Sequence, residues 1–552
     1  MRPLRRVSLR VLLLVCAAVL GGTYVLTRRG VLPERELGSW LDTVGLGALP
    51  WTGGGGGQHS SAAAPDRYAA DQQRLAAVRR AMAHAWKGYR DHAFGQDELQ
   101  PLTRSGNVRW GNWSVSLVDA LDTLYLMGMR DEYAEAKAHV QKIDFTRSLP
   151  GRRVSVFEMT IRALGGLLGA YELDHDPALL AKAVEVGNTL AMAFASPTGL
   201  PYSTIDLSRP LDRGGPSSCI AEAGTLQLEF KKLSQLTGNR TYADLAHRAF
   251  EAIEAGERPV RGLYPSFIDV NTGRFEHYSG YSVSAYADSF YEYLLKQHIL
   301  HNLRRPEYGD RYVESVEAVK KYLVGKTPTG LTYLGTRTHH EGALASRMDH
   351  LACFYPGLLA LGAQVMDRPQ DLGLAEALAR TCYLSYKHSP TGLGPETFSL
   401  YTRSNSNNPR QRRAPPPSMP TPAEEQQQQQ QQAKQSLADL GIGVVNPKYI
   451  LRPETIESLF VLHRITGNPV YREWGWDIFQ AIEKYTRVEH GYAAYADIEN
   501  TSAKDSWEDS MESFFLAETL KYLYLLFAPH DLLPLDKFVL NTEAHPLRIM
   551  PS

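Results

Sequence analysis

Helical patterns of hydrophobic residues recur along most of the chain, and a similar turn separates them at nearly regular intervals. Five such turns begin with glycine and continue with aliphatic, aromatic or proline residues: Gly199–Tyr202, Gly262–Pro265, Gly330–Tyr333, Gly392–Pro395 and Gly491–Tyr492. Their glycines are 63, 68, 62 and 99 residues apart, and each interval can hold two helices and a short turn. About fourteen amphipathic stretches between residues 65 and 527 therefore predict about seven helical hairpins in an all-α body. Such hairpins stack into an open solenoid or close into a ring, and periodicity alone does not distinguish the two.

The longest interval contains a low-complexity insert at about residues 404–437. This insert includes Pro415–Pro417 and a run of glutamines. A segment of this composition cannot bury a core, so we expect it to loop out of the body. Without it, the last interval is close to the others in length, and residues 67–552 are expected to form one body.

The first 66 residues resemble a membrane anchor followed by a stem. Four arginines lie before the apolar run at 11–27, and Arg28–Arg29 close it. We expect a cytoplasmic tail at 1–10, a transmembrane signal anchor at 11–27 and a flexible lumenal stem at 28–66. A cleaved signal peptide is the alternative, because the run is slightly short and contains small residues.

Charge and cysteine content restrict the partners and the compartment. The chain carries 59 basic and 60 acidic residues, so its composition gives no reason to expect a nucleic-acid partner. Outside the anchor it has Cys219, Cys353 and Cys382, which allow one disulfide and one free thiol in an oxidising compartment. We expect the bridge between Cys353 and Cys382, because both lie within helical patterns that a bridge would join.

A second regularity places one ionisable residue near the start of every other predicted helix. The residues are Glu158, Glu222, Asp288, His350, Glu454 and Glu512, with spacings of 64, 66, 62, 104 and 58. Equal phase puts these side chains at the same end of equivalent helices. In a closed ring they would converge on one mouth, and this convergence is the main functional inference from the residues.

Each of these residues also has an ordinary structural interpretation. Glu158 and Arg162 at i,i+4 can form an exposed ion pair. The same helical stripe continues with Gly165 and Gly169, which would weaken a solvent-exposed helix, so we interpret the stripe as leaving room for a ligand. Asp288 can be an N-cap, His350 can be a core histidine, and Glu454 and Glu457 can stabilise a helix dipole after Pro453. The functional interpretation therefore depends on the shared phase.

Two carboxyl groups facing each other across a sugar are sufficient for glycoside hydrolysis. One group must donate a proton to the leaving oxygen, and the other must take a proton from water. Glu158, on an apolar helix, is the expected acid, although Arg162 opposes a rise of its pKa. Asp288 and Glu454 are the candidate bases.

The segment Leu540–Pro546 offers a hydroxyl, a carboxylate and an imidazole within four residues. It follows an apolar run at 532–539, so it can return to the body and plug the centre of a ring. Thr542 would then bind a calcium ion, with Glu518 and Glu543 holding its waters. A polar surface tail is the alternative. Neither an EF-hand loop nor a zinc-ligand spacing occurs in the sequence.

At these residues the chain resembles the class I α-1,2-mannosidases, glycoside hydrolase family 47. The resemblance extends over about residues 70–547 apart from the insert. The matching segments are Asp97–Leu99, Val118–Leu124, Val156–Glu158, Ile161–Arg162, Thr225–Phe230, Asp288–Tyr293, Arg452–Ser458, Met511–Phe515 and Asn541–Pro546.

The resemblance implies an (α/α)7 barrel with short β-hairpins, plugged by its C-terminal hairpin. It implies an inverting, calcium-dependent exo-glycosidase that removes terminal α-1,2-mannose from high-mannose N-glycans. Glu158 then matches the acid, Asp288 and Glu454 the candidate bases, Thr542 the direct calcium ligand, and Cys353 and Cys382 a disulfide. Residues expected to line the sugar or the ion are Arg162, Glu222, His350, Glu396, Arg452, Glu457, Phe514, Glu518 and Glu543.

Two features depart from the family pattern. Tyr286 stands where relatives usually carry Arg or Leu, a position tied to the choice of branch, and the insert follows Glu396 closely. We expect a monomeric, single-pass mannosidase of the Golgi or endoplasmic reticulum membrane. Because of Tyr286, the sequence does not predict which glycan branch is trimmed first. The alternatives are a lumenal mannose lectin in glycoprotein quality control and a helical-barrel glycosidase for another sugar.

Overall fold

The computed structural model describes residues 68–209, 214–276, 279–401 and 436–551. Within these residues no helix combines the length and the apolar composition that crossing a membrane requires. The expected tail, anchor and stem and nearly all of the expected insert lie outside the described residues. Leu437, at the end of that expected insert, is buried and belongs to the body. The described residues all belong to one compact unit, which holds all the described helices and strands.

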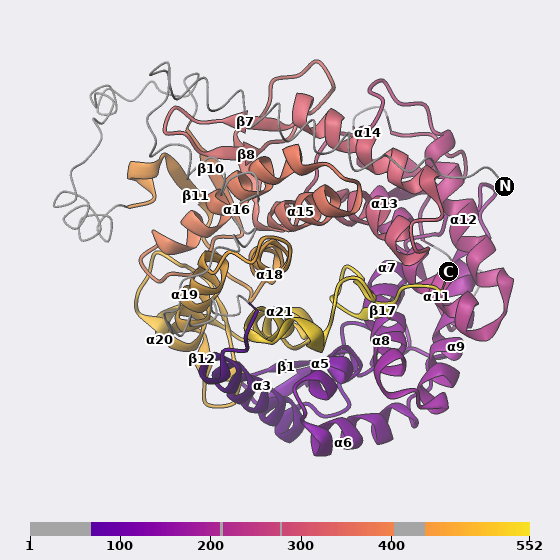
Figure 1. Cartoon of the computed structure of the whole chain (residues 1–552). Coiled ribbons are helices and arrows are strands. Elements are labelled where there is room, and N and C mark those ends of the chain that lie inside the picture. The colour runs from indigo at the N-terminus through magenta and orange to yellow at the C-terminus, as the bar shows by residue number, and fades with distance from the viewer. Residues whose placement is uncertain (1–67, 210–213, 277–278, 402–435, 552) are drawn as a thin grey trace, which may run out of the picture. The chain divides into compact units, whose positions relative to one another are not determined.

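The helices of this unit alternate between an inner and an outer ring (Figure 1). The outer helices are α3 (Gln72–His92), α6 (Arg130–Val140), α9 (Pro177–Ala191), α12 (Arg240–Ala255), α14 (Pro306–Tyr322), α16 (Leu372–Lys387) and α19 (Val470–Tyr485). The inner segments are α4–α5 (Val115–Asp119, Leu121–Leu126), α7–η1–α8 (Val156–Met159, Thr160–Leu164, Gly165–Asp174), α10–α11 (Ile220–Gly224, Gln227–Thr237), α13 (Asp288–Leu300), η3–α15 (His350–Phe354, Tyr355–Val365), α18 (Glu454–Thr466) and η8–α21 (Phe515–Thr519, Leu520–Phe527). Short helices at Met192–Phe194, Pro369–Asp371, Ala438–Leu440, Ala503–Ser506 and His530–Leu532 lie in the connections.

The last inner segment packs against the first outer helix, which closes the ring. Helix α21 contacts α3, and the backbone N–H of Asp71 donates to the carbonyl of Phe527 at 3.0 Å. The described residues thus form seven helical hairpins in a closed barrel, which confirms the expected (α/α)7 fold and excludes the open solenoid.

The five repeated turns each begin with a glycine at positive φ. Gly199, Gly262, Gly330, Gly392 and Gly491 all have positive φ angles, from 77° to 128°. L-residues with a side chain rarely adopt such angles, so glycine is required where each outer helix turns into its following hairpin.

Short antiparallel strands occupy the loops between helices. They pair as β1–β2 (Glu98–Gln100, Ser105–Asn107), β3–β4 (Val154–Ser155, Thr204–Ile205), β5–β6 (Ser217–Cys219, Phe267–Asp269), β7–β8 (Val324–Lys326, Thr332–Leu334), β12–β13 (Arg487–Val488, Gly491–Tyr492) and β14–β15 (Ala494–Tyr495, Trp507–Glu508). The described strands include one three-stranded sheet, β9–β10–β11 (Arg347–Asp349, Thr397–Leu400, Ile442–Asn446), and residues 402–435 connect β10 to β11.

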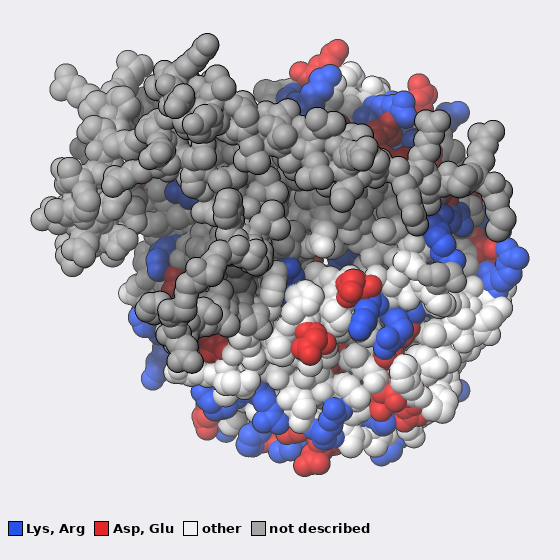
Figure 2. All heavy atoms as spheres, viewed as in Figure 1, with Lys and Arg blue, Asp and Glu red and all other residues white. Residues whose placement is uncertain are grey.

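Cys353 and Cys382 form the expected disulfide, with Cα atoms 6.0 Å apart, and Cys219 is a buried free thiol. The bridge joins the inner segment η3 to the outer helix α16. Figure 2 shows basic and acidic side chains interspersed on the face in view, in agreement with the near-zero net charge.

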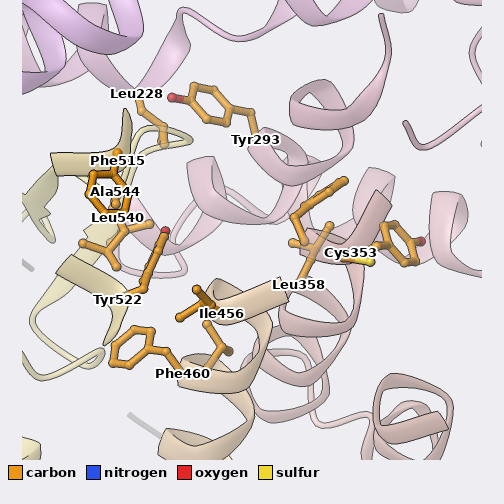
Figure 3. Packing of buried hydrophobic residues seen from close by; sticks show 14 of the residues in the cluster. Leu228, Tyr293, Cys353, Leu358, Ile456, Phe460, Phe515, Tyr522, Leu540 and Ala544 are labelled. Carbon is orange, nitrogen blue, oxygen red and sulfur yellow. The ribbon is translucent and has the colours of Figure 1, made fainter. Parts of the chain in front are cut away.

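The C-terminal hairpin of the described chain enters the centre of the ring. Strands β16 (Phe538–Leu540) and β17 (Pro546–Arg548) pair with Leu540 opposite Pro546, so the turn between them is 541–545. In Figure 3, Leu540 and Ala544 lie beside Phe515 and Tyr522 of the last inner segment. The segment is therefore a buried plug, and the alternative of a polar surface tail is wrong.

The glycines of helix α8 make room for this plug. A Cβ atom on Gly165 would lie 2.6 Å from Nδ2 of Asn541, and one on Gly169 would lie 3.1 Å from Pro546 Cδ. The sequence analysis interpreted Gly165 and Gly169 as leaving room for a ligand. That interpretation is corrected, because the space beside these glycines is filled by the protein's own C-terminal hairpin.

Candidate active site

A cavity of about 310 Å³ opens among the N-terminal ends of the inner segments. Eleven of the residues expected from the sequence line it: Glu158, Arg162, Glu222, Asp288, Arg452, Glu454, Glu457, Phe514, Glu518, Thr542 and Glu543. Two more, His350 and Glu396, lie behind it and bond to residues that line it. Glu512 is not among the lining residues and pairs instead with Arg109. The shared phase of the ionisable residues therefore corresponds to a shared mouth for four of its six members, with a fifth, His350, directly behind it.

Glu158 lies on one wall of the cavity. Ser155 caps its helix, accepting a hydrogen bond from the Glu158 N–H at 3.3 Å. Arg162 Nε donates to Glu158 Oε2 at 2.8 Å, and residues 160–164 form a π-helical turn. The wide turn lets Arg162 also reach Glu543 and the hydroxyl of Ser513. The Glu158–Arg162 pair is therefore part of the cavity wall and not a solvent-exposed helix pair.

Asp288 is the first residue of α13, and Ala287 is the N-cap, so the interpretation of Asp288 as an N-cap is wrong. Its Oδ1 accepts a hydrogen bond from the Ser289 N–H at 2.8 Å. Burial, opposed by that hydrogen bond and assisted by the nearby Glu292 and Glu454 charges, raises the pKa of Asp288 to about 7. A substantial fraction of this carboxyl is protonated at neutral pH.

Glu454 has the opposite electrostatic environment. His350 Nδ1 lies 2.7 Å from Glu454 Oε2, and Arg452 lies 3.4 Å from Oε1. Burial opposes ionisation, but the Arg452 charge and the bond to His350 outweigh it and lower the pKa of Glu454 below its usual value. Glu454 is therefore ionised at neutral pH.

His350 is fixed through its other ring nitrogen. Nε2 lies 2.5 Å from the hydroxyl of Tyr386 and 3.1 Å from Oγ1 of Thr455, and the side chain is 2% exposed. His350 is thus a buried histidine, as its ordinary structural interpretation predicts, and it also orients a carboxylate at the cavity.

Arg452 is held by Glu396 at the same wall. Its Nε donates to the two carboxylate oxygens of Glu396 at 2.7 and 3.0 Å. The ring of Phe514 lies 6.0 Å from the Arg452 guanidinium and 5.7 Å from that of Arg162, so it fills the space between the two cations. Phe514 presents an apolar surface of the kind that packs against a sugar ring.

We call the part of the cavity around Thr542 its floor, and several carboxylates lie close together there. Glu292, Glu457, Glu518 and Glu543 all line it. Lys296 pairs with Glu292 and Arg162 pairs with Glu543, whereas Glu457 and Glu518 form no ion pair among the described residues. Burial and the neighbouring carboxylates raise the pKa values of Glu457 and Glu518 well above their usual range. A cation at this floor would remove that repulsion.

Ionic contacts beneath the floor hold the turn that carries Thr542. His545 Nδ1 lies 2.8 Å from Asp122 Oδ2 and Nε2 lies 3.0 Å from Asp119 Oδ1. Lys521 donates to Asp122 at 2.8 Å and to the Ala544 carbonyl at 2.7 Å. Sequence reasoning did not find this network, because its members lie on segments about 400 residues apart.

The floor suits a hard cation bound largely through water. The part of the chain that the structure describes contains no group of three or more His, Cys, Asp or Glu side chains in direct metal-ligand geometry. The donor set at the floor is instead one hydroxyl and backbone carbonyl at Thr542 with carboxylates around them, all oxygen, as calcium prefers. These residues fit the expected ion.

Sequence reasoning missed Glu292, although it lies one helical turn after Asp288 and faces the same side. It also missed Cys219, which caps α10 at the cavity wall. Tyr286 lies at the rim, 59% exposed, with φ of 73° and its ring 5.1 Å from that of Phe267. A tyrosine held at positive φ is strained, so the surrounding structure determines its position.

A closed ring of paired helices with ionised and protonated carboxyl groups at one mouth defines a helical-barrel glycosidase. The model of glycosyl hydrolase family 47 matches residues 81–549, and the chain belongs to this family. It is 38% identical over 490 residues to the endoplasmic reticulum mannosyl-oligosaccharide 1,2-alpha-mannosidase of Rattus norvegicus, covering 87% of this chain and 69% of that one. It is 40% identical over 491 residues to mannosyl-oligosaccharide 1,2-alpha-mannosidase MNS1 of Arabidopsis thaliana, covering 87% and 79%.

The fold agrees with a solved structure of the same kind. The alpha-1,2-mannosidase from Trichoderma reesei superposes with a TM-score of 0.78 at 32% identity, covering 87% of this chain and all of that one. The resemblance inferred from the sequence motifs is therefore confirmed.

Proposed function

We propose that this protein is an exo-acting α-1,2-mannosidase that removes terminal mannose from high-mannose N-glycans with inversion of configuration. The observation that carries the proposal is the pairing, in one cavity, of an ionised Glu454 with carboxyls that can carry a proton. Inverting hydrolysis needs that combination, because one group activates water while the other protonates the leaving oxygen. The names of the relatives support a mannosyl-oligosaccharide substrate with α-1,2-linked mannose, and the high-mannose N-glycan is our proposal within that class.

Glu454 is the proposed base. Its carboxylate is kept ionised by Arg452 and oriented by His350, so it can accept a proton from water. The acid has two candidates. Glu158 is the one expected from the sequence, and it forms an ion pair with Arg162. Asp288 is the other, because its pKa of about 7 lets it hold a proton.

The proposed cofactor is calcium, bound by Thr542 with Glu518 and Glu543 holding its waters. A bound calcium ion would supply a hard positive centre for sugar hydroxyls at the cavity floor. The residues of the chain itself position that floor through the His545 network and the paired cations Arg162 and Lys296.

The remaining sugar contacts are proposed from the cavity walls. Arg162, Glu222, Arg452 and Glu457 offer charged hydrogen-bonding groups, and Phe514 offers an apolar face. Tyr286 at the rim lies where the rest of the glycan would leave the cavity, so it is a candidate for setting which branch is trimmed first.

We place the protein in the secretory pathway, as a type II membrane protein of the endoplasmic reticulum or Golgi with residues 67–552 in the lumen. The relatives include an endoplasmic reticulum enzyme, and a disulfide suits an oxidising lumen. The anchor at 11–27, the stem at 28–66 and the monomeric state are part of this proposal.

Mass spectrometry of a high-mannose glycan incubated with the protein tests the function. Stepwise loss of hexose units, abolished by a calcium chelator and restored by calcium, is the expected result. Binding of the glycan without loss of mass would instead support the lectin alternative. Release of a different sugar from a mixed glycan panel, with mannose untouched, would support a glycosidase of another specificity.

A further inference from the structure

A second cavity lies at the end of the barrel opposite the active site. Its volume is about 440 Å³, within the range of small-molecule sites. It is lined from α11, α12, the end of α13 and the start of α14, and we call it the basal pocket: Lys231, Arg240, Asp244, His301, Arg305 and Tyr308 are its principal residues. Helix α13 runs from Asp288 at the active site to Leu300 beside this pocket, which is a separation of about 20 Å.

The basal pocket contains a buried amine without a counter-charge. Lys231 is 5% exposed, and its Nζ donates to Gln297 Oε1 at 2.5 Å and to the Tyr308 hydroxyl at 2.7 Å, both neutral groups. Among the described residues no carboxylate forms an ion pair with it. Burial lowers the pKa of this unpaired amine well below its usual value, and an anion beside it would stabilise the charged form.

A histidine beside Lys231 has an unused nitrogen. His301 Nε2 is buried and has no hydrogen-bond partner in the described structure. Its ring stacks on Tyr308, with centroids 6.2 Å apart and planes at 13°, and Lys231 Nζ lies 4.1 Å from the centre of the same Tyr308 ring. A buried ring nitrogen without a hydrogen-bond partner and an amine without a counter-charge therefore flank one aromatic ring.

The rim of the basal pocket is also cationic. Arg305 is 44% exposed and pairs with Glu307, and Arg240 has no ion pair among the described residues. Of the lining residues only Asp244 is acidic, so positive charge exceeds negative charge.

We propose that the basal pocket binds a phosphate- or sulfate-type oxyanion through Lys231, His301 and Arg305. A tetrahedral oxyanion has enough acceptor oxygens to satisfy all three groups, and charge-assisted hydrogen bonds of this kind are strong. The volume admits either the free ion or a small ester that carries it.

The chain segment after β17 closes one side of this pocket. Met550 lines it and donates its N–H to the Leu300 carbonyl at 2.9 Å, and Arg304 donates to the Pro551 carbonyl at 2.6 Å. An oxyanion bound here would therefore stabilise the segment that anchors the plug, without contacting the sugar site.

Isothermal titration of the full chain with sodium sulfate tests the proposal, with sodium chloride added to keep the ionic strength constant. Direct titration is needed because sulfate raises the melting temperature of many proteins by exclusion from their surface. We expect saturable binding at one site. Lys231→Met should weaken it at least tenfold, and Arg305→Gln should weaken it several-fold, with mannose release unchanged in both.

Arg487→Gln is the matched control. Arg487 is 38% exposed, pairs with a glutamate and lies 5.7 Å from a tyrosine ring, as Arg305 does, but it is outside the pocket. This variant should bind sulfate as the parent does. His301→Gln provides a second pocket variant in case Lys231→Met folds poorly.

Glycerol 3-phosphate distinguishes the source of the oxyanion. Tighter binding than sulfate indicates an organic ester, and equal binding indicates the free ion. The absence of saturable binding of both probes would overturn the proposal. Equal sulfate affinity in Lys231→Met, His301→Gln and the parent would overturn it as well.

Discussion

His350 Nδ1 lies 2.7 Å from Glu454 Oε2 and joins two inner segments 104 residues apart in the chain. Together with the charge of Arg452, the imidazole stabilises the charged form of this carboxylate, and it also orients the carboxylate. A residue that does not line the cavity therefore contributes to the protonation state of one that does.

Replacing His350 should shift the pH dependence of hydrolysis. The pKa of Glu454, the proposed base, is lowered in the parent protein, so this carboxylate remains ionised as the pH falls. His350→Phe should raise that pKa, so kcat/KM should be lost at a higher pH on the acidic side. The rate at neutral pH should fall about 10- to 100-fold, the equivalent of one charge-assisted hydrogen bond. Tyr386→Phe, which removes one of the two partners of Nε2 and leaves the Nδ1 contact in place, should shift the profile less. An unchanged acidic limb in His350→Phe would remove Glu454 as the base.

The two acid candidates can be separated with a substrate that needs no proton. Loss of the general acid should slow glycan hydrolysis about 10²- to 10⁴-fold but leave hydrolysis of α-mannosyl fluoride largely intact, because fluoride leaves without protonation. Glu158→Gln and Asp288→Asn should be compared on both substrates. The variant that loses only glycan hydrolysis identifies the acid. If Glu158→Gln hydrolyses the glycan at the rate of the parent, Glu158 is not the general acid expected from the sequence.

Calcium should stabilise the folded protein through Thr542. A ligand that binds only the folded state increases the free energy of unfolding, by about 2.7 kcal/mol at a ligand concentration of a hundred times its Kd. The melting temperature rises accordingly. Chelation should lower the melting temperature of the parent, and calcium should restore it. Thr542→Ala should melt near the chelated parent and respond weakly to calcium. A full calcium response in this variant would contradict the proposed ligand.

A methyl group on Gly165 should displace the plug. Its Cβ would lie 2.6 Å from Asn541 Nδ2 and 2.9 Å from His545 Cδ2. Gly165→Ala should therefore destabilise the protein by about 1–3 kcal/mol, as overpacking does, and reduce hydrolysis because Thr542 follows Asn541. Gly373→Ala is the matched control: Gly373 also lies in a helix, but a Cβ there meets nothing within 4 Å. That variant should be neutral or more stable by up to about 1 kcal/mol. Urea unfolding of both variants measures the difference, and equal stabilities would argue against the tight fit.

The sequence pattern predicted the repeat unit and the mouth of the barrel well. The phase of Glu158, Glu222, Asp288 and Glu454 follows from the hairpin repeat, so one regularity placed four carboxylates. The same regularity predicted that His350 lies near the mouth. It did not predict that His350 lies behind the cavity wall, because its position there depends on its rotamer and on the contact with Tyr386. Periodicity left ring closure open, and only the family resemblance implied it. The contact of Gly165 with Asn541 and the bonds of His545 to Asp119 and Asp122 were not predictable. They are set by tertiary packing between distant segments, which periodicity does not encode.

The contact between Arg162 and Glu543 spans 381 residues. Bringing such distant segments together costs loop-closure entropy, and contacts of high sequence separation form slowly during folding. A partly folded chain with its first hairpins in place therefore has Glu158 and Arg162 but no floor beneath them. The site is complete only when the ring is closed, so hydrolytic activity reports the completion of folding.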